Sequence, residues 1–150
     1  LNYSYFYNTK KIIENYESFL DKKSIYFNNL GHYECILDEN KILHFSYKLI
    51  ENNRNNFVHK VGLTFGIEYK LLCEVDDSIP LNVKWLYPPG MKDIDGNNIN
   101  EDNLFYNRAT NTEVVECYII ESENEMIPGD WTVQVLFDTT ILYQKTFRLF

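Results

Sequence analysis

Residues 128–137 have the sequence PGDWTVQVLF, and this stretch does most to decide the fold class. Pro128-Gly129 breaks the chain, and apolar and polar residues then alternate. A period of two places apolar side chains on one face of a β-strand and polar side chains on the other. A short connection at 138–140 leads into residues 141–150, which we expect to return as the partner strand of a hairpin.

The same alternation occurs in two earlier segments. Apolar residues occupy the odd positions of 67–75 and are separated mainly by charged residues. Residues 81–87 repeat the pattern and run into Pro88-Pro89-Gly90, which is typical of a type II turn because Gly accepts the positive φ that this turn needs. Trp85 and Trp131 fall on the apolar faces of their strands, so we expect both rings to anchor the core.

The remaining segments complete the predicted fold class. Strands are expected over 25–37 and 42–50, and 115–119 carries a further apolar face. Gly66 within a strand indicates a bulge or the close approach of another backbone. The polar, Asn-rich residues 96–112 are predicted to be a long loop. With turn signals about every ten residues, the pattern predicts a mostly β fold, an antiparallel β-sandwich of about seven strands.

The first 24 residues differ from the rest. A helical spacing is shown by Ile12, Ile13, Tyr16, Phe19 and Leu20. It predicts a short amphipathic helix over 9–21. An aromatic cluster precedes this helix and consists of Tyr3, Tyr5, Phe6 and Tyr7. We therefore divide the chain into an N-terminal segment, 1–24, and a β-sandwich domain, 25–150. The cluster either binds a partner or packs across the sandwich as an intramolecular cap.

Length and charge narrow the classes of partner. A chain of 150 residues fits one domain, and 16% aromatic residues favour strands. The net charge is -8, and residues 61–150 hold fifteen Asp and Glu against six Lys and Arg. An acidic surface repels phosphate groups, so nucleic acid is excluded as a partner and anionic membranes are disfavoured. No stretch approaches the roughly 20 apolar residues of a membrane span.

The cysteines bear on the compartment. There are three, Cys35, Cys73 and Cys117, and no C-x-x-C motif. A disulfide scaffold has an even and dense set, so three reduced thiols are the preferred interpretation, with one bridge and one thiol as the alternative. Reduced thiols favour the cytoplasm. The chain begins at Leu1, so a trimmed signal peptide would instead place the protein in the periplasm or outside the cell.

Several segments together resemble a known family, the bacterial domain of unknown function DUF3859, over roughly residues 25–150. The segments that carry the resemblance are Gly31-His32-Tyr33, 62–69 (GLTFGIEY), 81–85 (LNVKW), 87–90 (YPPG), 127–133 (IPGDWTV), Leu142 and Phe147. The resemblance implies a bacterial origin and a compact immunoglobulin-like β domain. It implies no known activity, so no functional residue is carried over.

Catalytic motifs are missing from the sequence. It has no G-x-S-x-G, H-E-x-x-H, Walker A or G-x-G-x-x-G pattern. His32 and Cys35 are three positions apart, which places them on opposite faces of a strand and argues against a thiol–imidazole pair. We therefore assign no catalytic residue and expect no cofactor.

One segment resembles the start of a calcium loop. Asp93, Asp95 and Asn97 occupy every second position, and Gly96 lies between the last two. A helix-loop-helix calcium site needs Gly at position six and Glu at position twelve, but Gly96 is fourth and position twelve is Leu104. We expect a solvated turn, with a looser oxygen-ligand site as the alternative.

A second acidic segment alternates at Glu121, Glu123 and Glu125, which would line one face if it were extended. We interpret it as a solvated surface that protects a strand edge, with binding of a cation or a basic partner as the alternative.

These observations favour a non-enzymatic protein-protein interaction or accessory module. Its partner would be another protein, contacted through a sheet face, a strand edge or the N-terminal segment. The alternative is a protein that binds a small ligand or metal, or an enzyme whose site assembles from distant loops. A structural domain within a larger assembly is a third hypothesis.

Overall fold

The computed structural model describes residues 25–38, 44–52, 54–71, 76 and 78–150, with side chains from residue 54 onward. The predicted helix over 9–21 and the aromatic cluster Tyr3, Tyr5, Phe6 and Tyr7 lie outside these residues. Cys73 also lies outside them.

The described residues form nine strands and one short 3-10 helix. These are β1 Ile25–Asp38, β2 His44–Asn52, β3 Asn56–Phe57, β4 Thr64–Leu71, β5 Ser78–Leu86, β6 Glu101–Ala109, β7 Glu113–Ile119, η1 Glu123–Glu125, β8 Gly129–Phe137 and β9 Thr140–Leu149. No helical segment in this part of the chain has the length and apolar character needed to cross a lipid bilayer.

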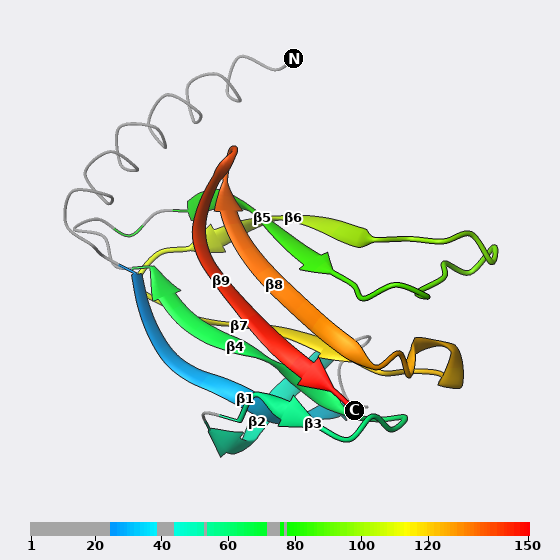
Figure 1. Ribbon diagram of the computed structural model, residues 1–150. Coiled ribbons are helices and arrows are strands. Elements are labelled where there is room, and N and C mark those ends of the chain that lie inside the picture. The colour runs from blue at the N-terminus through cyan, green and yellow to red at the C-terminus, as the bar shows by residue number, and fades with distance from the viewer. Residues whose placement is uncertain (1–24, 39–43, 53, 72–75, 77) are drawn as a thin grey trace.

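The strands form two sheets that enclose the core (Figure 1). One sheet has the order β2-β1-β4-β7, and the other has the order β3-β9-β8-β5-β6. Neighbouring strands are antiparallel, except that β3 pairs with the end of β9 in parallel over two residues. The predicted mostly β sandwich is therefore confirmed, with nine strands in the described residues where about seven were expected.

The alternation in the sequence corresponds to burial in the structure. In β5 the side chains of Ile79, Leu81, Val83 and Trp85 are buried, and the residues between them are exposed or half-buried. The predicted hairpin of β8 and β9 is also confirmed, because these strands pair along almost their full length. Asp138 makes the tight connection between them with a positive φ of 53°.

The predicted loop over 96–112 is wrong, because most of this segment is β6. All nine residues of β6 pair with β5 in one continuous register. Every side chain of β6 is exposed or half-buried. A strand that buries neither face needs no apolar alternation, because backbone hydrogen bonds to its neighbour hold it in place. This is why the polar sequence of 101–109 gave no indication of a strand.

Aromatic rings fill the centre of the sandwich. Phe65 lies between the sheets with its ring centroid 5.7 Å from Trp85, 5.8 Å from Trp131 and 5.3 Å from Phe147. The rings of these pairs meet edge to face, an arrangement that the aromatic quadrupole favours. Trp85 and Trp131 are both buried, so the prediction that they anchor the core is confirmed.

The strand β7 approaches β4 very closely at Gly66. A Cβ atom on Gly66 would lie 2.0 Å from the carbonyl oxygen of Glu116 and 2.7 Å from Cα of Cys117. The predicted close approach is confirmed. The apolar face predicted for 115–119 points away from the core, because the residue opposite Cys117 is Gly66 and the residue opposite Glu116 is the buried Ile67. The core face of β7 thus carries Glu116.

Candidate functional site

The candidate site lies along β6, at the edge of the five-stranded sheet. Strand β5 pairs with one edge of β6, and no strand among the described residues pairs with the other, which we call the open edge. Phe105 is 77% exposed and Leu104 is 43% exposed. An unpaired strand presents a row of backbone N–H and C=O groups, and an exposed aromatic ring adds apolar contact area.

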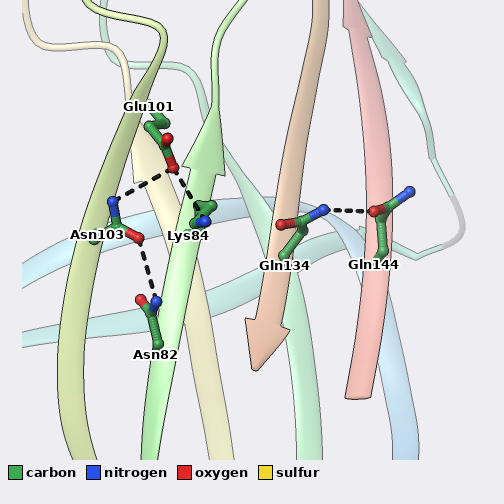
Figure 2. Close-up of polar contacts among 6 residues, drawn as sticks. All are labelled: Asn82, Lys84, Glu101, Asn103, Gln134 and Gln144. Atoms are coloured by element: carbon green, nitrogen blue, oxygen red, sulfur yellow. Dashed lines mark hydrogen bonds and ion pairs between the residues drawn. The ribbon is translucent and has the colours of Figure 1, made fainter. Parts of the chain in front are cut away.

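Beside the open edge, the outer face of the sheet carries a set of amide side chains. This amide face comprises Asn82, Asn103, Gln134 and Gln144, on four neighbouring strands (Figure 2). Asn82 Nδ2 donates to Asn103 Oδ1 at 3.2 Å, and Gln134 Nε2 donates to Gln144 Oε1 at 2.7 Å. Phe105 belongs to the same face because it lies directly opposite Asn82, and directly opposed residues share a face.

Charged and hydroxyl groups surround the amide face. Lys84 Nζ lies 3.2 Å from Glu101 Oε2, so this ion pair connects β5 to β6 (Figure 2). On the same face, between β8 and β9, the hydroxyl groups of Thr132 and Thr146 are 2.8 Å apart. These cross-strand contacts hold each side chain against its neighbour and form a polar surface next to Phe105.

The inner face of β6 connects the two sheets through a buried ion pair. Arg108 Nη2 donates to Glu116 Oε1 at 2.6 Å, and the Glu116 side chain is only 6% exposed. Tyr69 donates its hydroxyl proton to the same oxygen at 3.2 Å. The guanidinium of Arg108 also lies over the ring of Tyr106, with its carbon 3.8 Å from the centroid. One hydrogen-bond donor is left over: Arg108 Nε is buried and has no partner among the described residues.

Burial sets the protonation of this cluster. It raises the pKa of the Glu116 carboxyl above its ordinary value, and Arg108 acts in the opposite direction. Burial and the neighbouring Glu116 also raise the pKa of Tyr69, so that this hydroxyl stays neutral and donates. A carboxylate held by one cation and one hydroxyl group acts here as a connection between β6 and β7.

Two further carboxylates contact tyrosines at the end of the sandwich. Tyr87 donates to Asp102 Oδ2 at 2.6 Å, and Tyr118 donates to Glu125 Oε1. Burial raises the pKa of both tyrosines, so both stay protonated. Asp102 thereby fixes the beginning of β6 against Tyr87, which lies in the loop between β5 and β6.

The acidic row predicted at Glu121, Glu123 and Glu125 is not extended. Residues 123–125 form η1, and Glu125 turns back to accept hydrogen bonds from the backbone N–H groups of Glu121 and Ser122. A carboxylate three residues after a Ser is the arrangement of a capping box, which stabilises the start of a helical turn. The three side chains therefore do not line one face.

The calcium-like segment forms a local turn. Asp93 Oδ1 accepts the backbone N–H groups of Asp95 and Asn97, at 2.9 and 2.8 Å. Ile94 between them is fully exposed. Within the described residues no group of three or more His, Cys, Asp or Glu side chains is placed to hold a metal ion. The structure thus brings Asp93, Asp95 and Asn97 together through an Asx turn.

Comparison with known proteins places the chain in a family. A family model described as a domain of unknown function (DUF3859) matches residues 30–149. The chain belongs to the DUF3859 family. In the crystal structure of an immunoglobulin-like protein from Pseudomonas aeruginosa the fold is similar, with a TM-score of 0.62 and 18% identity over 84% of this chain and 96% of that chain. No curated protein gives a significant match.

Two of the segments that carry the DUF3859 resemblance, 87–90 and 127–133, pack against each other at one end of the sandwich. The rings of Tyr87 and Trp131 lie 5.1 Å apart, and Trp131 Nε1 donates to the carbonyl oxygen of Ile127 at 2.9 Å. Gly129 adopts a φ of +129°, and a Cβ there would lie 2.7 Å from Cβ of Pro88. Packing therefore accounts for the residue types at Tyr87, Gly129 and Trp131.

The sequence interpretation missed the open edge entirely, because it assigned β6 to a loop. One signal was available: Leu104, Phe105 and Tyr106 are consecutive apolar residues inside an otherwise polar segment. Solvated loops rarely present three such residues in a row.

Proposed function

We propose that this DUF3859 domain is a non-enzymatic protein-protein interaction module that binds a partner polypeptide along the open edge of β6. The observation that carries the proposal is a nine-residue edge strand with Phe105 at its centre, 77% exposed. A partner segment in extended conformation would add a strand to the sheet, with affinity from backbone hydrogen bonds and specificity from alternate side chains.

The open edge has few of the features that keep edge strands from pairing. Natural proteins protect such edges with proline, lysine, bulges or short strands. The sequence of β6 contains neither Pro nor Lys, and its register with β5 has no shift over nine residues. The other sheet has two edge strands, β2 and β7, and side chains are described only for β7. Strand β7 is shorter than β6, and its outward residues Val115, Cys117 and Ile119 are half-buried. Strand β6 is therefore a better docking strand than β7.

Site-specific photo-crosslinking tests the proposal in the native organism. One variant carries the photoreactive aromatic residue p-benzoylphenylalanine in place of Phe105, and the control carries it in place of the fully exposed Ile94 in the 92–98 turn. We expect a discrete crosslinked polypeptide from position 105 and none of it from position 94. Melting temperatures of the two variants should match that of the unmodified chain, since both positions are largely exposed.

Equal crosslinking from both positions, or none from position 105, would overturn the proposal. Crosslinks from position 94 alone would instead direct attention to the turn around Asp93 and to the loops at that end of the sandwich.

A further inference from the structure

The sequence of β6 is self-complementary about its central residue. Residues 102–108 read DNLFYNR, with Phe105 in the middle. At equal distances on either side of Phe105 lie first the aliphatic Leu104 and the aromatic Tyr106, and then Asn103 and Asn107. The outermost pair matches an acid with a base, Asp102 with Arg108.

We propose that the polypeptide bound along the open edge is a second copy of this chain, with the two β6 strands antiparallel about a two-fold axis at Phe105. This inference rests on the proposed function and names its partner. A two-fold interface brings the same surface of both copies together, so each contact occurs twice. Phe105 lies opposite Phe105 of the second copy, and Leu104 lies opposite Tyr106 of the second copy.

The faces of the strand agree with this register. Asp102 and Arg108 share the inner face, because they lie opposite the buried Trp85 and Ile79 on β5. Asn103, Phe105 and Asn107 share the outer face. Pairing about Phe105 places inner-face residues opposite inner-face residues, so the two five-stranded sheets would continue as one without exchanging faces.

Charge and hydrogen bonding single out this register. Directly opposed Cβ atoms lie about 4.5–5.5 Å apart in antiparallel strands, within reach of an Arg–carboxylate contact. Arg108 uses Nη2 for Glu116, and its side chain remains 24% exposed. Asp102 of the second copy would lie opposite this exposed part of Arg108. In a chain of net charge -8, such a pair also places a cation where two acidic molecules meet.

Neighbouring registers lack this match. An axis at Leu104 would place Arg108 opposite Asn100 of the second copy, and an axis at Tyr106 would place it opposite Leu104 of the second copy. Both leave Asp102 without a cation. The axis at Phe105 therefore combines apolar, amide and charge complementarity.

Cysteine crosslinking of the 150-residue chain reads out the register directly. Phe105→Cys should give a covalent dimer under mild oxidation, since opposed residues are within disulfide range. Asn103→Cys alone should not link to itself, but a mixture of Asn103→Cys with Asn107→Cys should form a mixed dimer. Peptide mass spectrometry identifies the 105–105 and 103–107 links and separates them from links through Cys35, Cys73 or Cys117. Ile94→Cys is the matched control.

Sedimentation equilibrium supplies an independent measurement without cysteines. The unmodified chain should dimerise as its concentration rises. Phe105→Lys should weaken dimerisation by about tenfold or more, because it places two like charges opposite each other. Ile94→Lys adds the same charge away from β6 and should have no effect.

Each outcome has a distinct meaning. A monomer at all concentrations with no 105–105 link overturns self-pairing, but the proposed function stands if photo-crosslinking at 105 captures a different protein. A dimer that links 103–103 in preference to 103–107 overturns the register. If neither the self-link nor any crosslink from 105 forms, both proposals fail.

Discussion

Gly66 allows strand β7 to approach strand β4 closely within the four-stranded sheet. The backbone of β7 occupies the space that a side chain at this position would need, with the Glu116 carbonyl oxygen 2.0 Å from the site of a Cβ. Backbone atoms cannot rotate aside as the end of a flexible side chain can. Any larger residue must therefore move β7 itself.

We expect Gly66→Ala to lower the free energy of unfolding by about 1–3 kcal/mol, the usual cost of overpacking. The control is Gly62→Ala, at an exposed position with a φ of +90° and open space where the Cβ would lie. Its cost is backbone strain alone, about 1 kcal/mol. Urea unfolding of both variants makes the comparison, and an equal or smaller cost at Gly66 would contradict the packing argument.

Residues whose surroundings are local could be predicted from the sequence. Trp85 and Trp131 stand in alternating strands, so their inward orientation follows from the residues beside them. The role of Glu116 could not be predicted, because Tyr69 lies far away in the sequence and Arg108, although near in sequence, lies on a strand of the other sheet. In an alternating strand, a buried acid resembles an exposed one until its partners are known.

At the scale of elements, strands with one buried face were predictable and β6 was not. Alternation reports burial, and β6 buries neither face fully. The extended acidic row was not found for a related reason. Its prediction used only the spacing of Glu121, Glu123 and Glu125, whereas hydrogen bonds between Glu125 and Ser122 fold the segment into η1. Short turns are decided by such side-chain–backbone hydrogen bonds, which compete with extended structure.

The 92–98 turn allows a direct test of the calcium hypothesis. Asp93 Oδ1 already accepts two backbone N–H groups, and a calcium ion would compete with both donors. We therefore expect millimolar calcium and a chelator to give the same melting temperature. A ligand that binds only the folded state raises stability, so a calcium-dependent increase would establish a site. Asp93→Ala should then abolish the increase.

At the scale of the whole molecule, the sequence predicts a sandwich but not its strand order. Alternation indicates which side chains face inward, and it carries no information on which strand lies beside which. The order β3-β9-β8-β5-β6 and the placement of β7 in the other sheet depend on contacts across the core. Arg108 and Glu116 form one such contact, and they join the two sheets.

This contact makes global stability depend on pH. Burial raises the pKa of Glu116 above its ordinary value of 4.5, so above that value the folded protein retains a proton that the unfolded chain releases. The free energy of unfolding should therefore fall as the pH rises through this window. Glu116→Gln removes the titration and should flatten the dependence in urea unfolding measured at several pH values.

The control for this titration is Glu113→Gln, at an exposed position on the same strand. Parallel pH profiles for Glu116→Gln and the unmodified chain would show that burial of Glu116 does not govern the dependence.

The position of β9 has a consequence for synthesis. This strand lies between β8 and β3, and its Phe147 packs against Phe57 and Phe65, which come much earlier in the chain. During synthesis the core therefore stays incomplete until β9 has left the ribosomal exit tunnel, and the apolar faces of the earlier strands remain exposed to solvent. A message cut short before the codons for β9 yields a chain that chaperones and proteases would recognise as unfinished.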